Sequence, residues 1–197
     1  MTTNAPSPHP VKVLAIVGSL RRGSYNRALL REAEAVKPPE MTVTEFDLRP
    51  LPFYDGDVEA VGDPEPVHRL KEAIRASDAL LIVSPEYHRS VPAVLKNALD
   101  WAGRDPKGKG AITASLSGKP VGLLGTSGPY GTLHAQMHLR QILAETRSLV
   151  LTQPQVYVTF ARQKFDANLK LTDEPTRAQL TDFMKALADW TRRLKAG

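Results

Sequence analysis

The stretch Gly18-Ser19-Leu20-Arg21-Arg22-Gly23-Ser24-Tyr25-Asn26 predicts the fold of this chain. An apolar run over residues 11–17, interrupted only by Lys12, precedes it, and a helical pattern over residues 26–36 follows it. A strand that leads through small polar residues into a helix is the place where α/β sheets bind anions, because loop N–H groups and the helix dipole point at the same space. We therefore expect an α/β sheet with an anion site after its first strand.

Four side chains of this stretch suit a phosphate group. Ser19, Ser24 and Asn26 offer uncharged hydrogen-bond donors, and Arg21 adds a planar cation. The stretch is not a nucleoside triphosphate loop, because Ser24 stands where that loop requires Lys, and it lacks the second Gly of a dinucleotide fingerprint. We expect a phosphate site for another ligand; the alternative is an ordinary strand-to-helix turn with a serine cap.

Composition indicates one globular domain. The 197 residues, 42% hydrophobic and 24% charged, are enough to bury a full core. The absence of Cys excludes a disulfide framework and a redox thiol. No apolar run approaches the ~18 residues of a membrane helix, and the proline-containing first ten residues do not resemble a signal peptide. We expect a disordered tail over residues 1–10, one domain over residues 11–197, a cytoplasmic location and no membrane partner.

The net charge of +5 raises the question of nucleic-acid binding. Much of the basic excess lies at the C-terminal end and in the loop of residues 103–118, and aromatic residues do not alternate with basic ones as a base-stacking surface requires. We expect no nucleic-acid partner.

Hydrophobic periodicity predicts five strands that alternate with five helices. The strands are expected at residues 11–17, 42–48, 79–83, 121–124 and 155–160, and the helices at residues 26–36, 67–77, 92–101, 132–143 and from residue 174 on. The strands are nearly all apolar, which favours a doubly wound parallel sheet with helices on both faces.

Three loops of this sheet are rich in Gly and small polar residues: residues 18–26, 84–90 and 125–131. Each follows a predicted strand, so all three belong to the carboxyl edge of the sheet and should converge where the strand order reverses. This convergence combines three weak motifs into one expected site.

The three loops contain no catalytic set. Pro129 stands where a hydrolase elbow requires Gly. His134 and His138 have the spacing of a metal pair on a helix but no third ligand nearby, so we expect a solvated pair and no metal. Glu86 is the lone carboxylate of its loop and is expected to be structural or to orient a ligand. An anion cradle, an aromatic residue (Tyr87) and a stretch of bare backbone suit a flat heteroaromatic phosphate that carries the chemistry itself.

Three segments resemble one family. They are Gly18-Ser-Leu-Arg with Ser24 and Asn26; Ser84-Pro-Glu-Tyr with Val91-Pro and Leu95-Lys-Asn-Ala-Leu-Asp-Trp101; and Gly131-Thr with Ala135-Gln and His138-Leu-Arg. Through them, most of residues 11–160 closely resembles the NADPH-dependent FMN reductases, which include quinone, azo-dye and chromate reductases. The resemblance implies a flavodoxin-like three-layer sandwich with strand order 2-1-3-4-5.

The resemblance also implies how FMN is bound. The residues that would hold the 5′-phosphate are Ser19, Arg21, Ser24 and Asn26. Those that would line the ring system and ribityl chain are Pro85, Glu86, Tyr87 and His88, and those that would meet the pyrimidine side or ribityl are Ser127, Gly128 and Tyr130. The family usually has Asn and Gly where this chain has His88 and Arg89, a difference that we expect to narrow or charge the mouth of the pocket.

The expected reaction is hydride transfer from NADPH or NADH to flavin N5, followed by reduction of a small-molecule electron acceptor in the same place, with ping-pong kinetics. Backbone N–H groups around Gly128 would stabilise negative charge near flavin N1. The family implies a homodimer or homotetramer, with residues 50–66 and 92–101 as candidate contacts. Two alternatives stay open at this point: a flavodoxin-type electron carrier, and a phosphate-ester binding module without redox chemistry.

Overall fold

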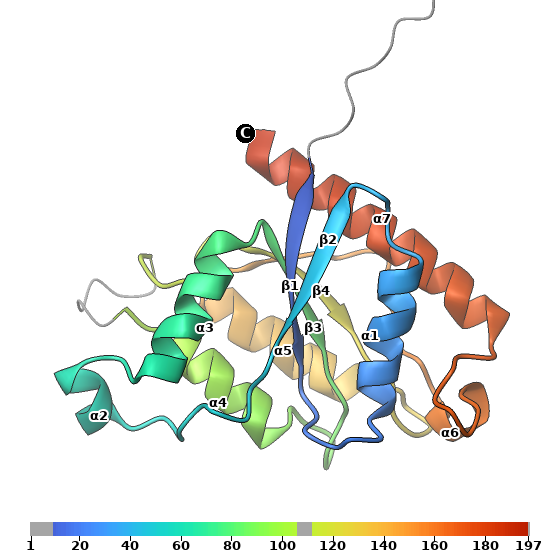
Figure 1. Cartoon of the computed structure of the whole chain (residues 1–197), viewed down its shortest axis with the longest axis horizontal. Helices are drawn as coiled ribbons and strands as arrows, with labels where there is room; N and C mark the ends of the chain where they lie inside the picture. The colour runs from blue at the N-terminus through green and yellow to red at the C-terminus, as the bar shows by residue number, and fades with distance from the viewer. Residues whose placement is uncertain (1–9, 106–111, 197) are drawn as a thin grey trace, which may run out of the picture.

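A five-stranded parallel sheet forms the centre of the computed structural model, which describes residues 10–105 and 112–196 (Figure 1). Its strands lie in the order β2-β1-β3-β4-β5, as the resemblance implies. Their bounds are β1 (Val11–Val17), β2 (Met41–Phe46), β3 (Ala79–Val83), β4 (Pro120–Leu124) and β5 (Leu149–Val150). Most of the expected N-terminal tail, residues 1–9, lies outside the described residues.

Seven helices are described. They are α1 (Tyr25–Ala35), α2 (Gly56–Val61), α3 (Glu65–Ala76), α4 (Ala93–Ala102), α5 (Leu133–Glu145), α6 (Ala161–Lys164) and α7 (Glu174–Ala196). The short helices α2 and α6 are absent from the prediction, which has a loop at residues 50–66 and a strand at residues 155–160. No helix in the described ranges has the length and apolar character that a membrane span needs.

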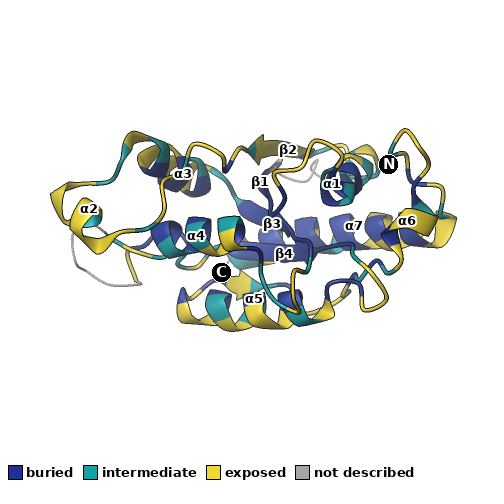
Figure 2. Ribbon diagram, turned by 90° about the horizontal axis from the view of Figure 1, so that it is seen from below, coloured by how far each residue is buried: buried dark blue, intermediate teal, exposed yellow. Residues whose placement is uncertain are grey.

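Two apolar clusters hold the layers together, one on each face of the sheet. Val13, Ala15 and Val17 face α1 and α7, whereas Leu14 and Ile16 face α3, α4 and α5. Every residue of β3 and β4 is buried, as a strand covered on both faces requires. The helices present buried sides to the sheet and exposed sides to solvent (Figure 2).

The predicted fifth strand is placed wrongly. The sheet ends with β5 at Leu149–Val150, and residues 155–160 form an extended loop that touches the sheet through one bridge between Val158 and Thr126. Pro154 lies between the two segments, and proline has no N–H to continue a strand ladder. The chain therefore leaves the sheet after β5 and returns to it beside the end of β4.

Candidate functional site

A cavity of about 340 Å³ opens at the carboxyl edge of the sheet, the lower edge in Figure 1. Eight predicted site residues line it: Ser19, Arg21, Ser24, Asn26, Pro85, Tyr87, Ser127 and Gly128. They come from the loops after β1, β3 and β4, so the predicted convergence of the three loops is present. The volume lies within the range of about 300–1,000 Å³ usual for small-ligand sites.

The loop after β1 forms the cradle at one end of the cavity. Gly18 donates its N–H to the Val83 carbonyl, at 2.9 Å, which fixes the loop against the neighbouring strand. Among the described residues, the backbone N–H groups of residues 19–26 donate to no protein acceptor. Ser24 caps α1 by accepting from the Arg27 N–H at 3.3 Å. A row of unused N–H groups at a helix N-terminus is the arrangement that binds a phosphate.

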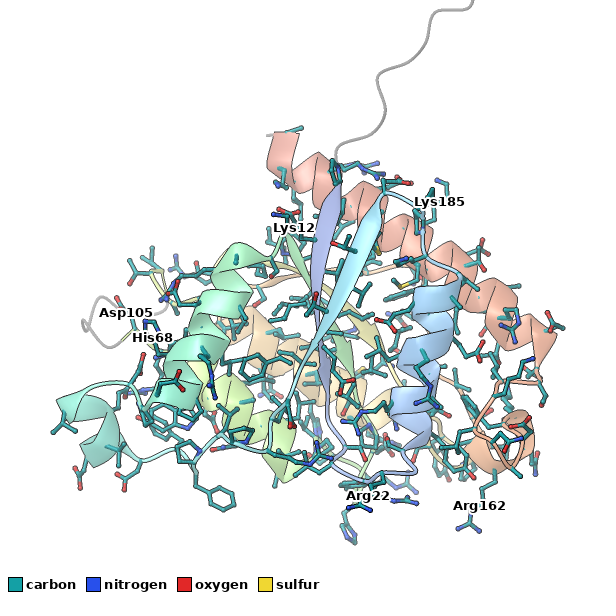
Figure 3. All side chains as sticks on the ribbon, viewed as in Figure 1. Lys12, Arg22, His68, Asp105, Arg162 and Lys185 are labelled. Atoms are coloured by element: carbon teal, nitrogen blue, oxygen red, sulfur yellow. The ribbon has the colours of Figure 1, made fainter. Side chains whose placement is uncertain are left out.

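The charge around the cavity is positive. Arg21 and Arg162 line it, and no Asp or Glu is among its lining residues. Figure 3 shows Arg22 and Arg162 extending outward at separate points of this edge of the molecule. Such a lining favours a ligand with an anionic group.

The side chain of Asn26 lines the cavity and also bonds to the loop after β4. Its Nδ2 donates to the Thr126 carbonyl at 2.9 Å, and its Oδ1 accepts from the Thr126 N–H at 3.0 Å. Both residues are buried. The amide therefore ties the loop after β1 to the loop after β4, and its backbone N–H remains part of the cradle.

The loop after β4 passes close beside the loop after β3. A Cβ at Gly125 would come within 2.3 Å of the Ser84 carbonyl and 2.4 Å of Thr132 Oγ1, so only glycine fits there. Gly128 has open space around it, and its N–H has no acceptor within the part of the chain that the structure describes. The loop thus offers a free backbone donor to a ligand.

A fourth segment reaches the cavity and is missing from the sequence prediction. Phe160, Ala161, Arg162 and Gln163 line it, and the Phe160 and Ala161 N–H groups donate to the Gly128 and Ser127 carbonyls, both at 3.0 Å. The available signal was topological, since the segment after the fifth strand also lies at the carboxyl edge. With that strand predicted at residues 155–160, residues 161–163 directly follow its carboxyl end, so the signal was present and was not used.

Three predicted residues lie outside the cavity lining: Glu86, His88 and Tyr130. Glu86 points instead at the start of α5, where its Oε2 accepts from the N–H groups of His134 (2.9 Å) and Ala135 (3.1 Å). Its Oε1 lies 3.1 Å from Nδ1 of His134. The carboxylate therefore caps a helix and fixes the loop after β3, because an anion at a helix N-terminus satisfies free N–H groups.

The two histidines of α5 bond to protein partners. His134 contacts Glu86, and His138 Nδ1 lies 3.0 Å from Ser90 Oγ. Within the described ranges, no three His, Cys, Asp or Glu side chains come together as a metal site would require.

A family model described as NADPH-dependent FMN reductase matches residues 11–163. An NAD(P)H-dependent FMN reductase of Pseudomonas aeruginosa is 45% identical over 186 residues, covering 94% of this chain and 97% of its own. A 2-hydroxy-1,4-benzoquinone reductase of Burkholderia sp is 40% identical over 183 residues, covering 92% and 97%.

A solved structure of a flavoenzyme has the same fold. The flavoenzyme NAD(P)H:(acceptor) oxidoreductase of Paracoccus denitrificans superposes with a TM-score of 0.83 at 34% identity, over 93% of this chain and 98% of that one.

Proposed function

The chain belongs to the NADPH-dependent FMN reductase family, and from this premise we propose that the cavity at the carboxyl edge holds FMN for NAD(P)H-dependent reduction of quinones. The protein is an FMN-dependent NAD(P)H oxidoreductase. We propose one FMN-binding domain over residues 11–197, at work in the cytoplasm. The observation that carries the site assignment is the cradle of unused N–H groups in the loop after β1, next to Arg21.

The phosphate end of the ligand would lie in this cradle. The unused backbone N–H groups of residues 19–26 and the hydroxyls of Ser19 and Ser24 would be the donors available to it, and Arg21 would contribute charge. Asn26 acts here through its hydrogen bonds to Thr126, which keep the first and third loops at a fixed separation.

The ring end would lie among Pro85, Tyr87 and Phe160, which are apolar and aromatic residues of the cavity lining. Gly128 has a free N–H, and a Cβ added to it would meet no atom within 4 Å, so a ring edge has room to approach its backbone. There the N–H would give FMN a preorganised donor, the kind of group that stabilises negative charge on a bound ring.

When bound, FMN would supply the redox chemistry, hydride acceptance from NAD(P)H and electron transfer to a quinone. The protein binds and orients the reactants and supplies the electrostatic environment. One open cavity serves both half-reactions, so the coenzyme leaves before the acceptor enters, and ping-pong kinetics are expected.

We also propose that the chain works as a homodimer or homotetramer. In the segment of residues 50–66, Phe53 is 82% exposed and Val61 90% exposed. The segment is held on α4, because the Pro52 carbonyl accepts from Asn97 Nδ2 (2.8 Å) and Trp101 Nε1 (3.0 Å). Exposed apolar side chains on a fixed support are typical of an interface. Light scattering of Val61→Glu against the wild type tests this; an unchanged mass would exclude this contact.

Steady-state kinetics tests the function. Purified protein supplied with FMN should oxidise NADPH continuously with menadione as acceptor, and initial rates at several menadione concentrations should give parallel double-reciprocal lines. A flavodoxin-type carrier would bind FMN yet show no sustained NADPH oxidation. That outcome would contradict the proposal.

A further inference from the structure

The turn of residues 87–90 has an unusual backbone for its sequence. The N–H of Tyr87 donates to the Ser90 carbonyl at 3.1 Å, and the N–H of Ser90 donates to the Tyr87 carbonyl at 3.0 Å. Between them, His88 and Arg89 have φ values of 50° and 61°. Two-residue turns with two positive φ values favour Asn-Gly, because L side chains disfavour this region. A strained turn that carries two large side chains beside a binding cavity suggests that a side chain has a role there.

The turn directs Arg89 toward the loop after β4. Its guanidinium carbon lies 4.2 Å from the centre of the Tyr130 ring, and its Nη1 lies 3.3 Å from Nε2 of His134. Tyr87, two residues before Arg89, lines the cavity, and so does Gly128, two residues before Tyr130. Arg89 therefore joins the two loops beside the cavity mouth.

A hydrogen-bonded chain keeps the guanidinium in place. Glu86 accepts two N–H groups of α5 with one oxygen, and its other oxygen lies 3.1 Å from His134 Nδ1. An ionised carboxylate can only accept, so in the neutral imidazole of His134 the bond to Glu86 requires the proton on Nδ1, which leaves Nε2 to accept from Arg89. Glu86 and His134 are thus positioning residues for Arg89.

The charge of Arg89 is not neutralised by the protein. Arg89 is exposed, and no Asp or Glu of the described chain forms an ion pair with it. The one carboxylate in this network, Glu86, is bonded to His134 and to the start of α5. Arg162 in the cavity lining adds a second cation near this approach, and a positive field attracts anions.

We propose that Arg89 is a specificity-determining residue that favours electron acceptors with a negative charge at neutral pH, such as sulfonated or ionised hydroxyquinones, over neutral quinones. This inference rests on the proposed quinone reductase function. A fixed cation beside the mouth stabilises the bound anionic acceptor and does not affect a neutral one of the same shape.

The test compares two acceptors, menadione and 1,4-naphthoquinone-2-sulfonate, on FMN-loaded enzyme. Arg89→Ala should lower kcat/KM for the sulfonate about tenfold, equal to about 1.4 kcal/mol, and leave kcat/KM for menadione within twofold. Arg89→Lys keeps the charge and should retain most of the preference. Arg193→Ala is the matched control, since Arg193 is an exposed arginine near the end of α7, at the opposite edge of the molecule. This variant should leave kcat/KM for both acceptors unchanged.

Calorimetry provides a readout independent of turnover. Binding of naphthalene-2-sulfonate to the FMN-loaded protein should weaken about tenfold in Arg89→Ala, whereas binding of 2-naphthol should not change. If the alanine variant fails to fold, Arg89→Gly replaces it, because glycine accepts a φ of 61° without strain.

Three results for Arg89→Ala would overturn the inference. An equal loss of kcat/KM for both acceptors would make Arg89 a purely structural part of the turn, and no loss of kcat/KM for either would remove it from acceptor selection. A rise in KM for NADPH with an unchanged ratio of kcat/KM between the two acceptors would assign Arg89 to the coenzyme. Each is distinct from failure of the proposed function, in which the wild-type enzyme would not reduce menadione at all.

Discussion

Replacing Asn26 with Ala separates a residue that holds the site together from one that only touches a ligand. The substitution removes the hydrogen bonds of 2.9 and 3.0 Å to the backbone of Thr126. Thr126 is 2% exposed, so its N–H and carbonyl lose their Asn26 partners away from bulk water. A buried polar group without a partner costs about 1–3 kcal/mol, and the adjoining cavity admits water to part of the gap. We expect flavin-free Asn26→Ala to lose about 2–4 kcal/mol of unfolding free energy.

Urea denaturation of the flavin-free protein measures this loss. Asn168→Ala is the control, because Asn168 is exposed and its side chain makes no hydrogen bond with the described residues; its unfolding free energy should stay within about 0.5 kcal/mol of the wild type. If Asn26→Ala has wild-type stability without flavin and differs only in FMN affinity, the residue is a ligand contact and the tie between the loops is irrelevant.

Three further variants probe other parts of the site and the fold. Arg21→Ala should weaken FMN binding by about 1.5–3 kcal/mol, the value of a charged hydrogen bond; an unchanged Kd in a fluorescence titration would remove Arg21 from the site. Glu86→Ala leaves the first N–H groups of α5 without their cap and should lower the unfolding free energy by about 1–2 kcal/mol, which thermal denaturation would reveal and an unaltered Tm would contradict. Hydrogen bonds from Thr176 hold the pKa of Asp173 below its usual 3.8. The ionised carboxylate therefore stabilises the folded protein above pH 4, and this contribution is lost as pH falls through the lowered pKa. The urea midpoint of Asp173→Asn should accordingly fall less than that of the wild type between pH 6 and pH 3; parallel decreases would refute this.

The first half of the site could be predicted from the sequence because its signals are local. The apolar run of β1, the small residues after it and the helical pattern of α1 are contiguous. The parallel topology then requires the loops after β1, β3 and β4 to share one edge. Chain order and hydrophobic pattern are enough for this step.

The remainder depends on contacts between residues far apart in the chain. Asn26 and Thr126 are 100 residues apart, and Glu86 and His134 are 48 apart. A carboxylate or amide in a loop looks the same in sequence whether it meets a ligand or a backbone group of another loop. Residues 155–160 have the apolar character of a strand, but β5 pairs with the start of β4, and residues 155–160 meet the sheet only through the bridge of Val158 to Thr126. Only the tertiary structure shows this.

Equilibrium binding of FMN and of riboflavin to the flavin-free protein tests the central claim, that a phosphate is held by the N–H cradle and Arg21 at the end of β1. FMN should bind at least about 100-fold more tightly than riboflavin, equal to about 2.7 kcal/mol, and Arg21→Ala should reduce this ratio of affinities. Equal affinities for the two flavins would contradict that claim, because the phosphate would then contribute nothing to binding.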